Sequence, residues 1–362
     1  MGKISREDAF TLWLMGTEAS SPQQILQRFG SAEAAFRAGV SGASKESLAK
    51  IVNRVEQGLN SGMEFISYKN PKFPSRLLPI PDAPLGIFVY GTLPSENTPA
   101  VAIVGSRGNT HYGGQVARRL GKELASLGIV VVSGMARGLD AQAHEGALAA
   151  NGETVAVLAC GVDNCYPAEN FQLYRRIRAT GCVISEYLPQ EKPQRWCFPA
   201  RNRIITAMAD VLVVAEAGVR SGTATTVNHA LDQGKEVFAV PGRIYDSQSI
   251  GTNELIKQGA HVLTSHLDLL PILKEQRHLA EFFKSAQLPQ LGQQQEDLSR
   301  VEKLSLASDE AFVYSCISHE AVTADYIAYK TGLNIAGLNK ILLEMELAGH
   351  IKKLPGQKFI RA

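Results

Sequence analysis

Four loops of this chain carry a glycine close to an arginine, and each follows an apolar run that predicts a strand. The loops are Gly105-Ser106-Arg107, Gly134-Met135-Ala136-Arg137, Gly218-Val219-Arg220 and Gly242-Arg243. Glycine lets the backbone approach an anion closely, the amides at a helix N-terminus donate to it, and arginine adds bidentate contacts. One such glycine is ordinary in an α/β protein, but a set of four with arginines favours an anion-binding rim.

A second cationic stretch precedes a predicted helix. Arg201 and Arg203 flank Asn202 just before an apolar helical run. The helix N-terminus and both arginines can bind a phosphate together, or the arginines can form salt bridges that cap the helix, and the sequence leaves both interpretations open. Arg195 stands beside Trp196, whose ring could stack on a base, although a tryptophan in the core is the more common case.

Several enzyme signatures are absent from the sequence. It has no G-x-x-x-x-G-K-[ST] run, no G-x-G-x-x-G after the first main strand and no G-x-S-x-G elbow, which disfavours a Walker-type ATPase, a nicotinamide dinucleotide site and a serine hydrolase. It has no H-E-x-x-H or C-x-x-C pair, so we expect no metal and no cofactor. His144, which follows Asp140, is a candidate acid or base, but a lone helical histidine is more often structural.

The composition is that of a globular chain. Hydrophobic residues make up 45% of the 362 residues, and no apolar run reaches the ~18 residues that cross a bilayer. The five cysteines are odd in number, which disfavours a disulfide framework, so we expect reduced thiols and a cytoplasmic location. The 37 basic and 35 acidic residues leave a net charge of +2, so any DNA site depends on where the arginines lie.

Alternating strand and helix patterns between residues 100 and 273 position these loops. Apolar runs recur at 100–104, 129–133, 154–158, 181–185, 211–215, 236–240 and 261–263. Continuous apolar runs predict strands buried on both faces, and the helical stretches between them predict a parallel sheet with helices on both sides. Because the carboxyl ends of parallel strands share one edge, we expect the glycine and arginine loops to meet there.

Further regions flank this sheet. Residues 1–66 show short amphipathic helical patterns, and the proline-rich residues 67–99 form a lead-in with one possible strand at 86–90. Residues 274–304 are polar and predict a flexible linker. Residues 305–362 have the pattern of three helices and a hairpin, which predicts a winged helix-turn-helix.

The motifs, taken in order, resemble those of the DNA-processing protein A family, also called DprA or Smf. The residues that carry the resemblance are Val104-Gly105-Ser106-Arg107, Ser133-Gly134-Met135-Ala136-Arg137-Gly138-Leu139-Asp140, Gly161-Val162-Asp163, Tyr166-Pro167, Ser185-Glu186-Tyr187, Phe198-Pro199-Ala200-Arg201-Asn202-Arg203-Ile204-Ile205, Glu216-Ala217, Arg220-Ser221-Gly222-Thr223, Val240-Pro241-Gly242, Gly251-Thr252-Asn253 and Leu255-Ile256-Lys257-Gln258-Gly259-Ala260.

The resemblance implies an α/β fold with an extended Rossmann-like parallel sheet core, a helical N-terminal domain similar to a sterile alpha motif, and a small C-terminal winged-helix domain. Family members bind single-stranded DNA, protect incoming strands during natural transformation and load the RecA recombinase onto them, as homodimers and without known catalysis. By motif, the DNA-binding residues are Gly105, Ser106, Arg107, Gly134, Arg137, Arg195, Arg201, Asn202, Arg203 and Arg220. The dimer face maps to Asn253, Leu255, Ile256 and Val262.

Two other functions stay open on the sequence. Nucleotide phosphoribohydrolases of a similar fold also place glycine-rich turns and an arginine around a phosphate. Here Glu216 is the candidate acid, although their Pro-Gly-Gly-x-Gly-Thr stretch is replaced by residues 217–223. A regulator that acts through residues 305–362 is the second alternative. The acidic Glu344 and Glu346 lie on the third helix of that region together with polar residues. This slightly favours contact with a partner or regulation over recognition of duplex DNA.

Overall fold

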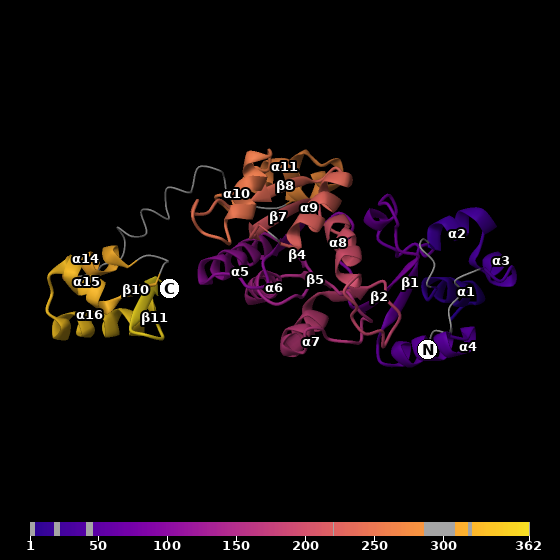
Figure 1. Ribbon diagram of the computed structural model, residues 1–362, viewed down its shortest axis with the longest axis horizontal. Coiled ribbons are helices and arrows are strands. Elements are labelled where there is room, and N and C mark those ends of the chain that lie inside the picture. Colours follow the sequence, from indigo (N-terminus) through magenta and orange to yellow (C-terminus); the bar gives the residue numbers. More distant parts are fainter. Residues whose placement is uncertain are drawn as a thin grey trace. The chain divides into compact units, whose positions relative to one another are not determined.

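The computed structural model describes residues 4–17, 22–40, 46–219, 221–285, 308–317 and 321–361. The chain forms two compact units, Met1–Leu288 and Pro289–Ala362. The larger unit is built on a nine-stranded sheet of order β1-β2-β6-β5-β4-β3-β7-β8-β9 (Figure 1). Its strands are β1 (Glu64–Ser67), β2 (Gly86–Gly91), β3 (Ala100–Gly105), β4 (Val130–Ser133), β5 (Thr154–Val157), β6 (Cys182–Ser185), β7 (Val211–Glu216), β8 (Glu236–Ala239) and β9 (His261–Val262).

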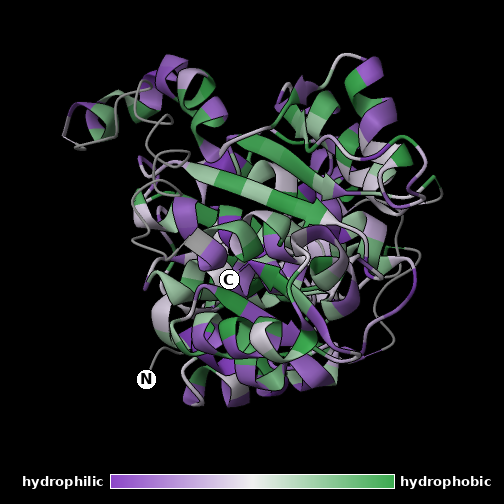
Figure 2. Ribbon diagram, turned by 90° about the vertical axis from the view of Figure 1, so that its left-hand side faces the viewer, coloured by the Kyte–Doolittle hydropathy of each residue, from purple (hydrophilic) through white to green (hydrophobic). Residues whose placement is uncertain are grey.

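The strands from β3 to β9 pair in parallel, and each of them matches a predicted apolar run to within one residue at either end. All residues of β4, β5, β6 and β7 are buried, as continuous apolar runs predict. Hydrophobic residues are concentrated along these strands (Figure 2). The Rossmann-like α/β core predicted from the sequence is therefore confirmed.

The sheet also contains two strands with antiparallel pairing, which lie before the region predicted as a parallel sheet. β1 pairs antiparallel with β2, and β2 pairs antiparallel with β6. Residues 68–85 between β1 and β2 contain only the 3₁₀ turn η1 (Ser75–Leu77), whereas a parallel pair needs a longer crossover, usually a helix. The proline-rich segment predicted as a lead-in thus contributes β2 and the end of β1 to the sheet.

Helices cover both faces of the sheet. The helices after β2 are α5 (His111–Ser126), α6 (Leu139–Ala149), α7 (Phe171–Thr180), α8 (Cys197–Ala207), α9 (Thr223–Asp232), α10 (Ile250–Lys257), α11 (Leu270–Glu275) and α12 (Ala280–Ser285). Residues of α5, α6 and α11 pack with Val101 and Ile103 of β3, and residues of α8 and α9 pack with Ala102 and Val104. Alternate residues of one strand therefore face two separate apolar layers.

The N-terminal helices share a core with the sheet. They are α1 (Arg6–Met15), α2 (Pro22–Phe29), α3 (Ala32–Arg37) and α4 (Leu48–Asn60). The Ser5 hydroxyl accepts a hydrogen bond from the Asp8 amide at the start of α1, and Trp13 packs edge-on against Phe36 at 5.0 Å. Their apolar residues join those of α7 and β2 in one cluster. The domain boundaries at 66, 99, 273 and 304 stay predictions.

Part of the predicted linker is structured. Residues 277–285 form η4 (Arg277–Leu279) and α12. Leu279 is fully buried in the same apolar cluster as residues of α5. Residues 286–304 lie outside the described residues.

The smaller unit has the winged-helix elements predicted from the sequence. They are α14 (Ser308–Cys316), β10 (Val322–Thr323), α15 (Ala324–Thr331), α16 (Ile335–Leu347), β11 (Ile351–Leu354) and β12 (Lys358–Arg361). Its sheet has the order β10-β12-β11, and Gly332 ends α15 with φ +70°, which favours glycine. The Asn334 side chain accepts a hydrogen bond from the Gly337 amide at 2.8 Å and so begins α16.

Candidate nucleic-acid interface

The loop after β3 holds Arg107 at the carboxyl edge of the sheet. The Ser106 amide donates to the Glu216 carbonyl at 2.9 Å, and the Leu139 amide donates to the Ser106 carbonyl at 3.3 Å. A side chain at Gly105 would collide with Leu139, so this close packing requires glycine. Arg107 is exposed, and its guanidinium lies 5.0 Å from the centroid of the Phe198 ring. Among the described residues, none forms an ion pair with it.

The loop after β4 is held by a buried carboxylate. Asp140 accepts hydrogen bonds from the amides of Gly134 at 3.2 Å and Ala136 at 3.3 Å. These amides are therefore already bonded and are not open to a phosphate. Arg137 is exposed and pairs with the exposed Glu169 through two hydrogen bonds, at 2.7 Å and 2.5 Å, which raises its pKa. An exposed pair is weak, so a phosphate can compete with Glu169 for this arginine.

Arg201 lies inside the protein rather than on its surface. The residue is only 3% exposed. Its guanidinium donates hydrogen bonds to the carbonyl oxygen of Gly134, at 2.7 Å, and to that of Val157. Burial lowers the pKa of Arg201 and raises that of Asp140, and the charge of each opposes that effect on the other. Asn202 accepts a hydrogen bond from Arg201 Nε at 3.2 Å. These contacts tie the carboxyl ends of β4 and β5 to α8.

Arg203 is also bonded within the protein. It forms two 2.6 Å hydrogen bonds to the carboxylate of Glu186 and two more, at 3.0 Å and 2.8 Å, to the carbonyl oxygen of Asp82. α8 begins at Cys197, so Arg201 and Arg203 lie within the helix, whereas the sequence interpretation places them just before it. Arg203 forms a salt bridge with Glu186, whereas Arg201 bonds backbone carbonyl oxygens, so neither arginine caps the helix. A direct role for either of them in DNA binding stays a prediction.

Aromatic side chains border Arg107. Tyr166 lies 5.6 Å from the Phe198 ring and is partly exposed. Trp196 is 66% exposed, which is the opposite of the core position that the sequence favours. It precedes α8, whose buried residues begin at Cys197, so the indole falls outside the packed face of the helix. Arg195 beside it is exposed. The adjacent Arg195 and Trp196 were the sequence signal for this surface.

The predicted dimer-face residues lie on α10 and β9, away from Arg107 in the sequence. Arg220 lies outside the described residues. Asn253 bonds both polar groups of the Gly242 backbone, at 3.1 Å and 3.0 Å, and Leu255 packs against the core. Ile256 is half-buried, and Val262 is exposed on β9, an edge strand. A strand edge offers unpaired backbone groups to a second chain, and the dimer face stays a prediction.

The two candidate acid–base residues are buried. Glu216 is 3% exposed, and its carboxylate accepts hydrogen bonds from the Thr110 amide at 2.9 Å and the Thr110 hydroxyl at 2.6 Å, beside the start of α5. It therefore occupies the helix N-terminus that a phosphate would use. His144 Nδ1 is hydrogen-bonded to Thr154 at 2.7 Å, and burial lowers its pKa to about 3. The described residues contain no group of three or more candidate metal ligands.

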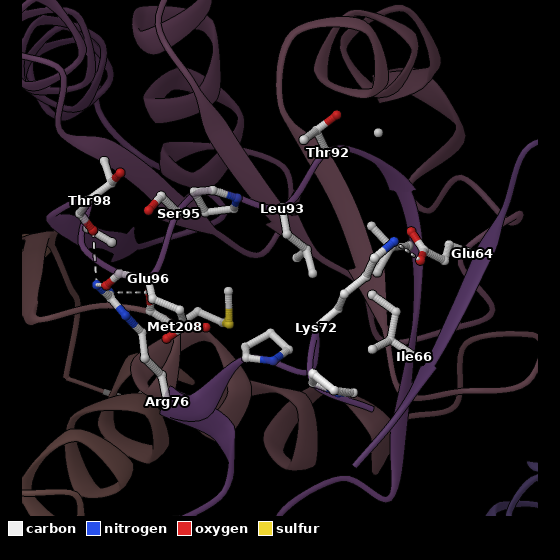
Figure 3. A pocket seen from close by; sticks show the side chains of 16 residues that line it. Glu64, Ile66, Lys72, Arg76, Thr92, Leu93, Ser95, Glu96, Thr98 and Met208 are labelled. Atoms are coloured by element: carbon white, nitrogen blue, oxygen red, sulfur yellow. Dashed lines mark hydrogen bonds and ion pairs between the residues drawn. The ribbon is translucent and has the colours of Figure 1, made fainter. Parts of the chain in front are cut away.

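A pocket lies at the opposite, amino edge of the sheet (Figure 3). It has a volume of about 410 Å³ and is lined by residues of β1, β2 and the segments that follow them, including Leu93, together with Met208. Its two cations have partners: Lys72 binds Glu64 at 3.0 Å, and Arg76 binds Asp210 at 3.2 Å. No helix among the described residues is long and apolar enough to span a membrane.

These features define a class, an α/β protein with a Rossmann-like core and a separate winged helix. The model of the DNA recombination-mediator protein A family matches residues 64–274, and the model of the DprA winged helix domain matches residues 300–357. The chain is 40% identical over 222 residues to DNA processing protein DprA of Bacillus subtilis, covering 61% of this chain and 73% of that protein. The chain belongs to the DprA family.

Two of the solved structures that are similar to it come from the same family. The X-ray structure of DprA from Streptococcus pneumoniae has a TM-score of 0.63 at 31% identity and covers 75% of this chain and 98% of that one. A structure of DNA processing protein A from Helicobacter pylori, described in terms of its single-stranded DNA binding mode, has a TM-score of 0.52 at 29% identity. It covers 62% of this chain and 97% of that one.

Proposed function

We propose that this protein binds single-stranded DNA at the carboxyl edge of its sheet, protects incoming strands in natural transformation and loads the RecA recombinase onto them. It acts as a homodimer and not as a catalyst. The observation that carries the proposal is Arg107, which is exposed, lies against an aromatic ring and forms no ion pair with any described residue. The relative from H. pylori, described by its single-stranded DNA binding mode, supports the same ligand.

The test is fluorescence anisotropy with a labelled oligo-dT strand and its duplex, across a salt series. We expect tight, salt-sensitive preference for the single strand. Arg107→Ala should weaken binding by about 1–3 kcal/mol and make the salt dependence shallower, because one phosphate contact is lost. Lys72→Ala is the matched control, because it removes an exposed cation at the amino edge. Equal affinity of Arg107→Ala and wild type would reject the site.

Two further measurements address the partners. Sedimentation of wild type and of Val262→Glu tests the dimer, because a charge on the exposed edge strand β9 should shift the protein to a monomer. DNA-dependent ATP hydrolysis by RecA, measured on strands coated with a competing single-strand binder, tests loading. Deleting residues 305–362 should leave strand binding intact, and loss of binding would favour a regulator that acts through the winged helix.

A further inference from the structure

The segment before α8 presents two cations and one indole to solvent. Lys192, Arg195 and Trp196 are all exposed and lie within five consecutive residues. Neither cation has an ion pair with any described residue. This distinguishes the segment from Arg137 and Arg203, which are each bound to a carboxylate.

The indole of Trp196 is supported on one side and open on the other. Its ring meets the ring of Tyr187 edge-on, with centroids 6.0 Å apart and an interplanar angle of 70°. Tyr187 is itself buried, and its hydroxyl donates to the Cys197 carbonyl at 3.3 Å. The supporting ring is therefore fixed, and it orients an indole that keeps 66% of its surface in solvent.

Phe198, two residues further on, is less available. Its ring already has the Arg107 guanidinium at 5.0 Å and the Tyr166 ring at 5.6 Å. Trp196 is therefore the large ring of this stretch that is open to stack on a planar ligand, and the neighbouring cations fit the phosphates that flank such a ligand. Unpaired bases expose their faces, whereas the bases of a duplex are stacked on one another.

We infer that Trp196 is a stacking site for an unpaired base of the bound strand, with Lys192 and Arg195 binding the flanking phosphates. This inference rests on the proposed function and adds a second contact region beyond Arg107. It assigns part of the preference for single strands to one side chain, because only an unpaired base can lie flat on the indole.

The experiment compares Trp196→Ala and Trp196→Phe in the full chain, with oligo-dT and with an abasic strand of the same length. Stacking contributes about 1–3 kcal/mol per base, so Trp196→Ala should bind oligo-dT between about 5-fold and about 150-fold more weakly. Trp196→Phe keeps an aromatic face and should retain most of the affinity. The abasic strand has no base to stack, so wild type and Trp196→Ala should bind it equally.

The chain also carries its own optical probe. It has two tryptophans, and Trp13 is only 4% exposed, so acrylamide quenches mainly Trp196. Saturating oligo-dT should change the emission of Trp196 and protect it from acrylamide, whereas duplex DNA should not.

The outcomes separate the two proposals. The stacking site is rejected if Trp196→Ala binds oligo-dT as tightly as wild type, or if its affinity for the abasic strand falls by the same factor as its affinity for oligo-dT. In either case, weaker binding by Arg107→Ala still supports the DNA-binding edge. If wild type binds no single strand at low salt, the proposed function fails first.

Discussion

The two edges of the same sheet use cations in different ways. At the amino edge, Lys72 and Arg76 each bind a carboxylate, and Asp210, the partner of Arg76, is almost fully buried. At the carboxyl edge, Arg107 and Arg195 are exposed without a carboxylate partner among the described residues. A net charge of +2 conceals this difference, since Lys72 and Arg76 are neutralised within the fold, whereas Arg107 and Arg195 are available to an anion. The other two carboxyl-edge arginines discussed above, Arg137 and Arg203, are paired with carboxylates.

The carboxyl edge itself has two layers. Arg107 lies on the surface, whereas Arg201 lies beneath the loops and binds backbone carbonyl oxygens. Substitutions in the outer layer should therefore change DNA affinity, and substitutions in the inner layer should change folding.

The largest effect is expected for Arg201→Ala. It leaves the Gly134 and Val157 carbonyl oxygens without their donor and the buried Asp140 without its nearby cation. Removing one member of a buried charged set costs about 3–5 kcal/mol of the free energy of unfolding. Urea denaturation measures it. Unchanged stability together with lost DNA affinity would place Arg201 in the outer layer instead.

Arg76→Ala tests the amino edge. Arg76 binds Asp210 and the carbonyl oxygens of Glu96, Thr98 and Met208, so we expect a loss of about 3 kcal/mol in the free energy of unfolding. The affinity of the folded protein for oligo-dT should stay at the wild-type value, measured well below the melting temperature. A specific loss of affinity would show that the two edges are not separate.

Glu191 is a carboxylate near the carboxyl edge, and it predicts a pH effect. Burial raises its pKa from 4.5 to about 7, an effect that Arg54 opposes and Glu46 and Glu186 reinforce. The folded protein then holds a proton that the unfolded chain releases. Stability should therefore fall as the pH rises from about 4.5 to about 7, by about 3 kcal/mol.

Glu191→Gln removes this titration. The melting temperature of the variant should then depend less on pH between pH 5 and pH 8 than that of the wild type. Relative to the wild type, the variant should become more stable towards pH 8. A profile of unchanged slope would assign the pH dependence to other groups.

The smallest effect is expected for Glu169→Gln, which frees Arg137 from its carboxylate. The pair is exposed, so folding should hardly change. Affinity for oligo-dT should rise slightly because a competing anion has been removed, and anisotropy at low salt is the sensitive measurement. Weaker binding would mean that Glu169 positions Arg137 for the strand.

Local patterns predicted the parallel strands and the position of β2, but not β1 or the antiparallel pairing. β3 to β8 are apolar runs because both faces of each are covered, and this is visible in the sequence. β1 is short and begins with the exposed Glu64, and it joins the sheet through its antiparallel pairing with β2. That pairing depends on partners 19 to 25 residues further along the chain, which no short window contains.

The sequence predicted where on the sheet the candidate site lies, but not which contacts its side chains make. Glycine and arginine loops located the carboxyl edge. Arg107 and Arg201 look alike in the sequence, and only the three-dimensional positions of Phe198, Gly134 and Val157 make one a surface group and the other an internal one. The exposure of Trp196 likewise depends on which face of α8 packs inward.

The contact between Gly134 and Arg201 has an evolutionary consequence. A Cβ atom at position 134 would lie 2.6–2.7 Å from the guanidinium of Arg201, which has no room to move aside. A side chain at 134 is therefore excluded while Arg201 is present, whereas loss of Arg201 removes the collision but leaves Asp140 and the Val157 carbonyl oxygen without their partner. Among diverging descendants of this chain, glycine should be retained at 134 wherever arginine is retained at 201.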